Sequence, residues 1–100
     1  MLHTVNKSPF EKNSLETCLR LVEDNSSILL IEDAVYGALK NTSFESAIIN
    51  AQKANKFYVL GPDLKARGLD KSSLISNIDI IDYKQFVKLT VENVKVQNWL

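Results

Sequence analysis

The stretch Ser27-Ile28-Leu29-Leu30-Ile31 decides the fold, because it is an unbroken aliphatic run with no alternation of polar residues. A strand that is apolar on both faces belongs in the middle of a parallel sheet that helices cover on both sides. The run has the length of a strand and is far shorter than the ~20 residues that span a bilayer. We therefore expect a central, fully buried strand at Ser27–Ile31.

Segments with other patterns lie on both sides of this strand. Upstream, Leu2–Val5 predicts a strand, and Asn13 followed by Glu16 predicts a helix that begins with a capping box. Downstream, strands are expected at Phe57–Leu60 and Ile78–Ile81, and helices at Ala34–Lys40, Phe44–Ala54, Leu64–Arg67 and Tyr83–Val91. Alternating strands and helices indicate right-handed crossovers. The predicted fold class is α/β, a small three-layer sandwich with a mainly parallel sheet of four or five strands.

Composition predicts one globular domain over residues 1–100, because hydrophobic residues make up 45% and charged residues 24% of the chain. Twelve basic and twelve acidic residues cancel, so direct binding to nucleic acid has no electrostatic basis. The first residues lack the basic and apolar segments of a secretion signal, and a lone cysteine suits a reducing compartment. We therefore expect a cytoplasmic protein without membrane contact.

The C-terminal tail, from Val94 to Leu100, includes Trp99 and is expected to expose apolar groups. A chain of this length buries a smaller fraction of its surface than a larger domain does. Association with other subunits would cover the remaining apolar surface, so the composition favours an oligomer.

Ligands of open α/β sheets bind beyond the carboxyl ends of the strands. No glycine-rich phosphate loop follows the first expected strand, so a nucleotide site is not expected. Glu32 and Asp33 end the central strand, and we interpret them as helix-capping residues rather than metal ligands. The basic turn Lys65–Gly68 is interpreted as a solvated helix end. The sequence therefore predicts no cofactor and no metal.

Two side chains, His3 and Cys18, are of types that can act as a base, a metal ligand or a nucleophile. His3 has no second histidine or positioned cysteine near it in sequence, which favours a structural, hydrogen-bonded role. Cys18 is the one plausible nucleophile, and sulfur transfer would require exposure and a lowered pKa. However, Cys18 shares a helical face with Leu15, Leu19 and Val22, which favours a core residue.

Several blocks of the sequence resemble the DsrH/TusB family, and they cover nearly the whole chain in order and spacing. The blocks are Leu2–Glu11, Asn13–Leu19, Leu29–Asp33, Val35–Leu39, Tyr58–Gly68, Asp82-Tyr83, Phe86–Thr90 and Gln97–Leu100. The resemblance implies the DsrE-like fold. It also implies a cytoplasmic sulfurtransferase complex, a dimer of heterotrimers that pairs this chain with a DsrE/TusD-like and a DsrF/TusC-like subunit. Sulfur carriers of the TusA and DsrC/TusE types would meet this chain only through the complex.

The resemblance also bears on where the sulfur is carried. In the DsrE/TusD subunits, the carrier cysteine ends a strand, ahead of a helical turn that closes with Arg and Gly. The corresponding stretch here, Val59–Asp63 before Arg67 and Gly68, has no cysteine. The resemblance thus implies that this chain is not the main catalytic subunit.

Cys18 matches a cysteine that DsrH-type members tend to have, which makes it a candidate auxiliary sulfur acceptor and tilts the resemblance toward the sulfur-oxidation branch. The other branch supplies sulfur for 2-thiolation of the wobble uridine of tRNA. An alternative function is a purely structural assembly subunit that never contacts the transferred sulfur.

Overall fold

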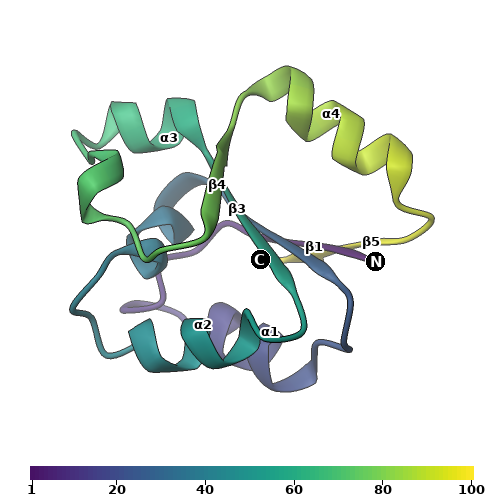
Figure 1. Cartoon of the computed structure of the whole chain (residues 1–100), viewed down its shortest axis with the longest axis horizontal. Coiled ribbons are helices and arrows are strands. Elements are labelled where there is room, and N and C mark those ends of the chain that lie inside the picture. Colours follow the sequence, from purple (N-terminus) through teal and green to yellow (C-terminus); the bar gives the residue numbers. More distant parts are fainter.

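A five-stranded sheet forms the centre of the computed structural model, which describes residues 1–100. Its strands are β1 (Leu2–Val5), β2 (Ser27–Leu30), β3 (Lys56–Leu60), β4 (Ile78–Ile81) and β5 (Val96–Trp99). They lie in the order β4-β3-β2-β1-β5, and every neighbouring pair is parallel. The predicted central strand is therefore confirmed, since β2 occupies the middle of the sheet (Figure 1).

The helical segments are α1 (Ser14–Leu21), the 3₁₀ helix η1 (Glu32–Ala38), α2 (Glu45–Ala51), α3 (Gly61–Ala66), η2 (Lys71–Ser73) and α4 (Tyr83–Glu92). From β1 to β4 the chain steps across the sheet in one direction, and α4 then carries it back from one edge to the other. Right-handed crossovers in opposite directions place their helices on opposite faces. Figure 1 shows this arrangement, with α1 and α2 on one side of the sheet and α4 on the other. The three-layer α/β class is thereby confirmed.

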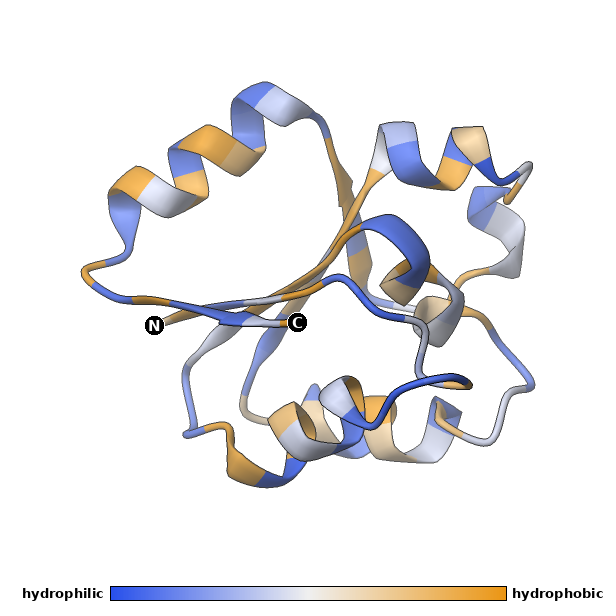
Figure 2. Ribbon diagram, turned by 180° about the vertical axis from the view of Figure 1, so that it is seen from behind, coloured by the Kyte–Doolittle hydropathy of each residue, from blue (hydrophilic) through white to orange (hydrophobic).

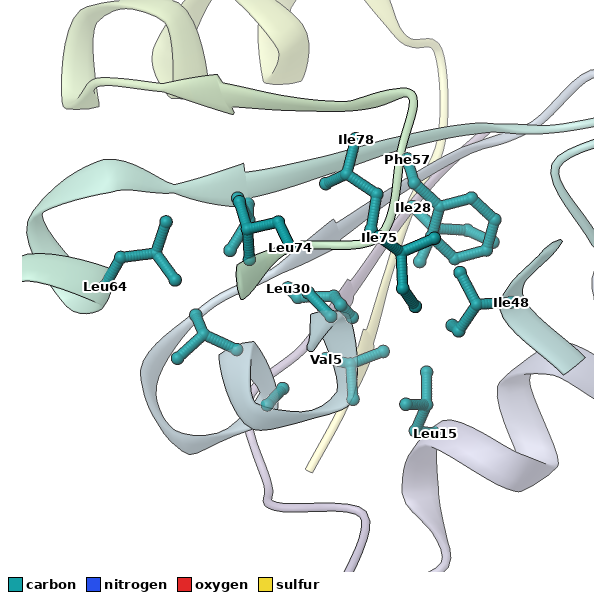
Figure 3. Close-up of a cluster of buried hydrophobic side chains, with 14 of the residues drawn as sticks. Val5, Leu15, Ile28, Leu30, Ile48, Phe57, Leu64, Leu74, Ile75 and Ile78 are labelled. Atoms are coloured by element: carbon teal, nitrogen blue, oxygen red, sulfur yellow. The ribbon is translucent and has the colours of Figure 1, made fainter. Parts of the chain in front are cut away.

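Each face of the sheet has its own hydrophobic core. The larger core holds 15 buried residues, among them Cys18 of α1. It also includes Ile28 and Leu30 of β2 and Leu15 of α1 (Figure 3). The smaller core lies under α4 and includes Leu29. Because successive residues of a strand point to opposite faces, a strand covered by helices on both sides favours apolar residues at successive positions. This explains the unbroken aliphatic run in β2.

The predicted capping box at Asn13 and Glu16 is wrong. Asn13 precedes α1 with a ψ of 14° and makes no side-chain capping bond, because capping requires an extended backbone that aims the side chain at the first turn. A capping box forms instead at α4, where Asp82 has an extended backbone. There the Gln85 N–H donates to Asp82 Oδ1 at 2.8 Å, and the Asp82 N–H donates to Gln85 Oε1 at 3.0 Å.

Other helix boundaries also differ from the prediction. The α-helix expected at Ala34–Lys40 is the 3₁₀ helix η1, which begins directly at Glu32. β3 ends at Leu60, and α3 begins at Gly61 and Pro62, ahead of the expected helix start at Leu64, because proline is favoured in the first turn of a helix, where no intrahelical N–H bond is needed. Gly68 has a φ of +66° and ends this helical segment, as predicted.

The C-terminal tail is a strand, so the prediction of an exposed Trp99 is wrong. Trp99 is partly buried, packs against the larger core, and donates its Nε1–H to His3 Nδ1 at 3.1 Å. The Ser14 hydroxyl donates to the Leu100 carbonyl oxygen at 3.0 Å, and Thr4 bonds Asn98 across the β1–β5 pair. These contacts fasten the two ends of the chain together.

No helix is long and apolar enough to cross a membrane.

Replacing the indole of Trp99 should therefore weaken the fold. We expect Trp99→Phe to lower the free energy of unfolding by about 1–3 kcal/mol, because it leaves the buried His3 Nδ1 without a donor. Equilibrium urea unfolding would measure the loss. Tyr83→Phe is the matched control, since Tyr83 is exposed and should change stability by less than about 0.5 kcal/mol. Equal stability of the two variants would contradict a role for the indole N–H.

Candidate functional site

The carboxyl ends of the parallel strands meet at one edge of the sheet, which is the usual place for a site in this fold class. Glu32 and Asp33 follow β2 there, and Gly61 and Asp63 follow β3 as the first turn of α3. The structure thus brings Glu32 and Asp33 close to Asp63, as the hydrogen bond between Glu32 and Asp63 shows. We call this set, with Arg67 at the end of α3, the strand-end rim.

Glu32 leaves β2 in a left-handed conformation, with a φ of +49°. A residue with a Cβ pays roughly 1–2 kcal/mol for this conformation. The Asp63 carboxylate compensates, because Oδ2 accepts a hydrogen bond from the Glu32 N–H at 2.6 Å. The rim is therefore held by a contact between the first residue of η1 and the first turn of α3, which are 31 residues apart in the sequence.

Arg67 makes the second connection across the rim. Its Nε donates to Asp33 Oδ1 at 2.9 Å, and its Nη2 lies 2.8 Å from the same oxygen. Nη1 also donates to the Asp63 carbonyl oxygen at 3.1 Å. The bond to Asp33 is the main reason that the pKa of Arg67 is raised. Arg67 thus fixes the loop after β2 to α3 and stays positively charged.

These contacts correct two interpretations of the sequence. Asp33 does not cap a helix, because Ile31 occupies the capping position and no side chain bonds there. Its carboxylate is used by Arg67 instead. Arg67, in turn, is not a solvated helix end but the centre of the rim. The pairing joins residues 34 positions apart, and no local pattern in the sequence indicates it.

No thiol lies at the strand-end rim. The chain's one cysteine, Cys18, sits in the middle of α1 and is fully buried in the larger core. Burial raises the pKa of the Cys18 thiol to about 12. The core interpretation of Cys18 is therefore confirmed for this chain, which lacks both the exposure and the lowered pKa that attack on a persulfide requires.

His3 is buried between β5 and β2, and its hydrogen bond from Trp99 confirms the structural interpretation. An indole N–H only donates, so Nδ1 is unprotonated and the proton of the neutral ring resides on Nε2. Nε2 is buried and has no partner. Burial lowers the pKa of His3 below its ordinary value, the nearby N-terminal ammonium lowers it further, and Glu23 partly opposes both.

The lowered pKa of His3 predicts a pH-dependent stability. As the pH falls below 6.5, the ordinary value, the unfolded chain binds the proton before the folded chain does. The free energy of unfolding should therefore fall until the pH has passed the folded pKa. Urea unfolding between pH 7.5 and 5.5 would show the decline, and His3→Gln, which cannot titrate, should lack it. An identical pH profile in both proteins would contradict the assignment.

No group of three or more His, Cys, Asp or Glu side chains is placed to hold a metal ion. A shallow hollow lies between α1 and α2, lined by residues of both helices that include Leu19, Arg20 and Ala47. Cys18 does not line it, although it belongs to α1. This hollow therefore gives a reagent no open route to the Cys18 thiol.

The fold and the rim define a class: a small parallel α/β chain whose strand-end segments are joined by ion pairs and carry no thiol. Comparison with known proteins gives the family. The family model described as DsrH like protein matches residues 7–96. This chain belongs to the DsrH/TusB family.

Individual relatives agree with this assignment over the full length. Protein TusB of Pectobacterium parmentieri is 36% identical over 99 residues, covering 99% of this chain and 100% of the relative. Protein TusB of Escherichia coli strain K12 is 35% identical with the same coverage. Protein TusB of Buchnera aphidicola is 34% identical, again with this coverage.

Solved structures show the same fold at low sequence identity. The ychN protein from Escherichia coli superposes with a TM-score of 0.83 at 20% identity, covering 97% of both chains. A protein of unknown function from Methanobacterium thermoautotrophicum gives a TM-score of 0.71 at 12% identity, covering 97% of this chain and 95% of the other. The predicted DsrE-like fold is confirmed by the first of these matches.

Proposed function

We propose that this chain is a non-catalytic subunit of a cytoplasmic sulfur-relay complex, a dimer of heterotrimers with a DsrE/TusD-like and a DsrF/TusC-like subunit. One observation carries the proposal. The stretch in which the family resemblance places a carrier cysteine is Val59–Asp63, which spans the junction of β3 and α3, and it has no thiol. A partner subunit would supply the carrier thiol, and carriers of the TusA and DsrC/TusE types would exchange sulfur with that partner.

The geometry of the rim supports this division of labour. Arg67 forms ion pairs with Asp33 and Asp63. Because these charges are already paired, they are not free to activate a thiol or bind a sulfur donor. The buried Cys18 supports the same conclusion. Both observations favour the alternative in which this chain assembles the complex without touching the transferred sulfur. The auxiliary sulfur role that the resemblance implies for Cys18 would require assembly to expose the thiol.

Two processes are open to the complex. Relatives named TusB match over their full length, which favours delivery of sulfur for the 2-thiolation of tRNA wobble uridine. The cysteine in the block Ser14-Leu15-Glu16-Thr17-Cys18 resembles DsrH-type members and favours dissimilatory sulfur oxidation. Deleting the gene and measuring thiolated uridine in tRNA would separate the two. Loss of the modified nucleoside supports the first process, and an unchanged level supports the second.

The assembly and the sulfur site can be tested together. Co-expression with the DsrE/TusD-like and DsrF/TusC-like chains of the same genome should give a hexamer in sedimentation. After treatment with a persulfide donor, mass spectrometry should find the extra sulfur on a partner cysteine and none on Cys18. A Cys18→Ala complex should transfer sulfur at an undiminished rate. A persulfide on Cys18 of the assembled wild type would overturn the non-catalytic assignment.

A further inference from the structure

Helix α4 carries apolar side chains on two different sides. Phe86 and Leu89 pack toward the smaller core of the sheet. On the outer side, Tyr83, Val87 and Val91 follow one another at four-residue intervals and are 59%, 61% and 79% exposed. Residues with this spacing lie on one helix face. Val94, just beyond the helix, is 98% exposed. We call these four residues the α4 ridge, and Figure 2 shows apolar segments along the length of this helix.

The side chains of the α4 ridge pack against neither hydrophobic core of the chain. Valine is a poorer helix former than Ala, Lys or Glu, because its branched side chain loses rotamer freedom against the preceding turn. Val87 and Val91 belong to neither core, so no packing inside the chain compensates for this loss. Contiguous apolar side chains on a soluble surface mark sites where another molecule binds.

Charge along the ridge indicates what kind of molecule binds. Lys84 and Lys88 are exposed, follow Tyr83 and Val87 by one position each, and so form a row beside the ridge. Neither lysine takes part in a salt bridge, and like charges at this spacing repel one another. A binding surface with carboxylates opposite this row would relieve the repulsion. An antiparallel pair of α4 ridges from two copies would instead bring the two lysine rows side by side.

We propose that the α4 ridge is the surface on which a partner subunit of the sulfur-relay complex docks. This partner presents an apolar patch to the ridge and Asp or Glu side chains to Lys84 and Lys88. The inference rests on the proposed function, which supplies the partner. It adds the face of the chain that is used, on the opposite side of the sheet from α1 and α2 (Figure 1).

The test uses the chain co-expressed with its DsrE/TusD-like and DsrF/TusC-like subunits. A double variant, Val87→Glu with Val91→Glu, should lower the amount of co-purified partner at least tenfold. Ile49→Glu is the matched control, because Ile49 is an exposed apolar residue of α2 in the opposite layer. It should leave the yield of partner unchanged. Far-UV circular dichroism of each purified chain checks that the fold is kept.

A second variant tests the charge without touching the apolar side chains. Lys84→Glu with Lys88→Glu should weaken partner binding several-fold, and raising the salt concentration should weaken wild-type binding in the same direction. If the wild type binds no partner, the proposed function fails. If the wild type and both ridge variants bind partners equally, the inference alone is overturned. Self-association that is lost in the Val87→Glu, Val91→Glu variant, without partner binding, would assign the ridge to a second copy and also overturn it.

Discussion

In the folded chain, Cys18 should react with a thiol reagent such as iodoacetamide about a thousandfold more slowly than in urea-unfolded chain at the same pH. The reactive species is the thiolate. Burial raises the pKa of Cys18 from its ordinary value of 9.0 to about 12, which lowers the thiolate fraction by about this factor. The fully buried side chain also has no open surface for the reagent to approach, so burial adds to the slowing and about a thousandfold is its lower limit.

The control for this measurement moves the thiol to the surface of the same helix. A double variant, Cys18→Ala with Arg20→Cys, places the cysteine at an exposed position of α1 and should react at the rate of an unfolded thiol. A fast reaction of native Cys18, equal to that of this variant, would show that α1 opens readily. Such a result would restore the auxiliary sulfur role that the structure disfavours.

The central strand shows why much of the fold could be predicted from the sequence. Ile28–Ile31 is apolar at every position, and a strand with helices on both sides buries such a run. The other three predicted strands, at Leu2–Val5, Phe57–Leu60 and Ile78–Ile81, then follow from the alternation of strands with helices. β5 was harder to place, because Val96–Trp99 mixes Gln97 and Asn98 with apolar residues and pairs with a strand at the other end of the chain.

The rim and the capping of α4 show two different reasons for missed features. Asp82 followed by Gln85 is a capping box that local sequence could have indicated. The pairing of Asp33 with Arg67 depends on where two loops meet in space, and no spacing rule describes it. Local chemistry made Asp33 a reasonable helix cap, but a long-range ion pair used its carboxylate instead. The same limit applies to His3 and Trp99, which lie 96 positions apart.

The largest structural effect is expected from removing β5. A chain that ends before residue 96 should fail to fold cooperatively at 25 °C, because the loss exceeds the lower end of domain stability, about 5 kcal/mol. Leu2 and Val5 of β1 are fully buried, and they would become part of an edge strand. The donor to His3 Nδ1 and the acceptor of the Ser14 hydroxyl would disappear at the same time. Circular dichroism during a urea titration would show the missing transition.

Leu100→Ala is the matched control for this truncation. The Leu100 side chain is 79% exposed while its carbonyl oxygen accepts from Ser14, so the variant keeps the bond and should change stability by less than about 0.5 kcal/mol. A truncated chain that unfolds with the same urea midpoint as the full chain would mean that four strands suffice. β5 pairs with β1 along its whole length. If its removal left stability unchanged, the contact between His3 and Trp99 would need another explanation, such as the shape of the sheet edge that a partner meets.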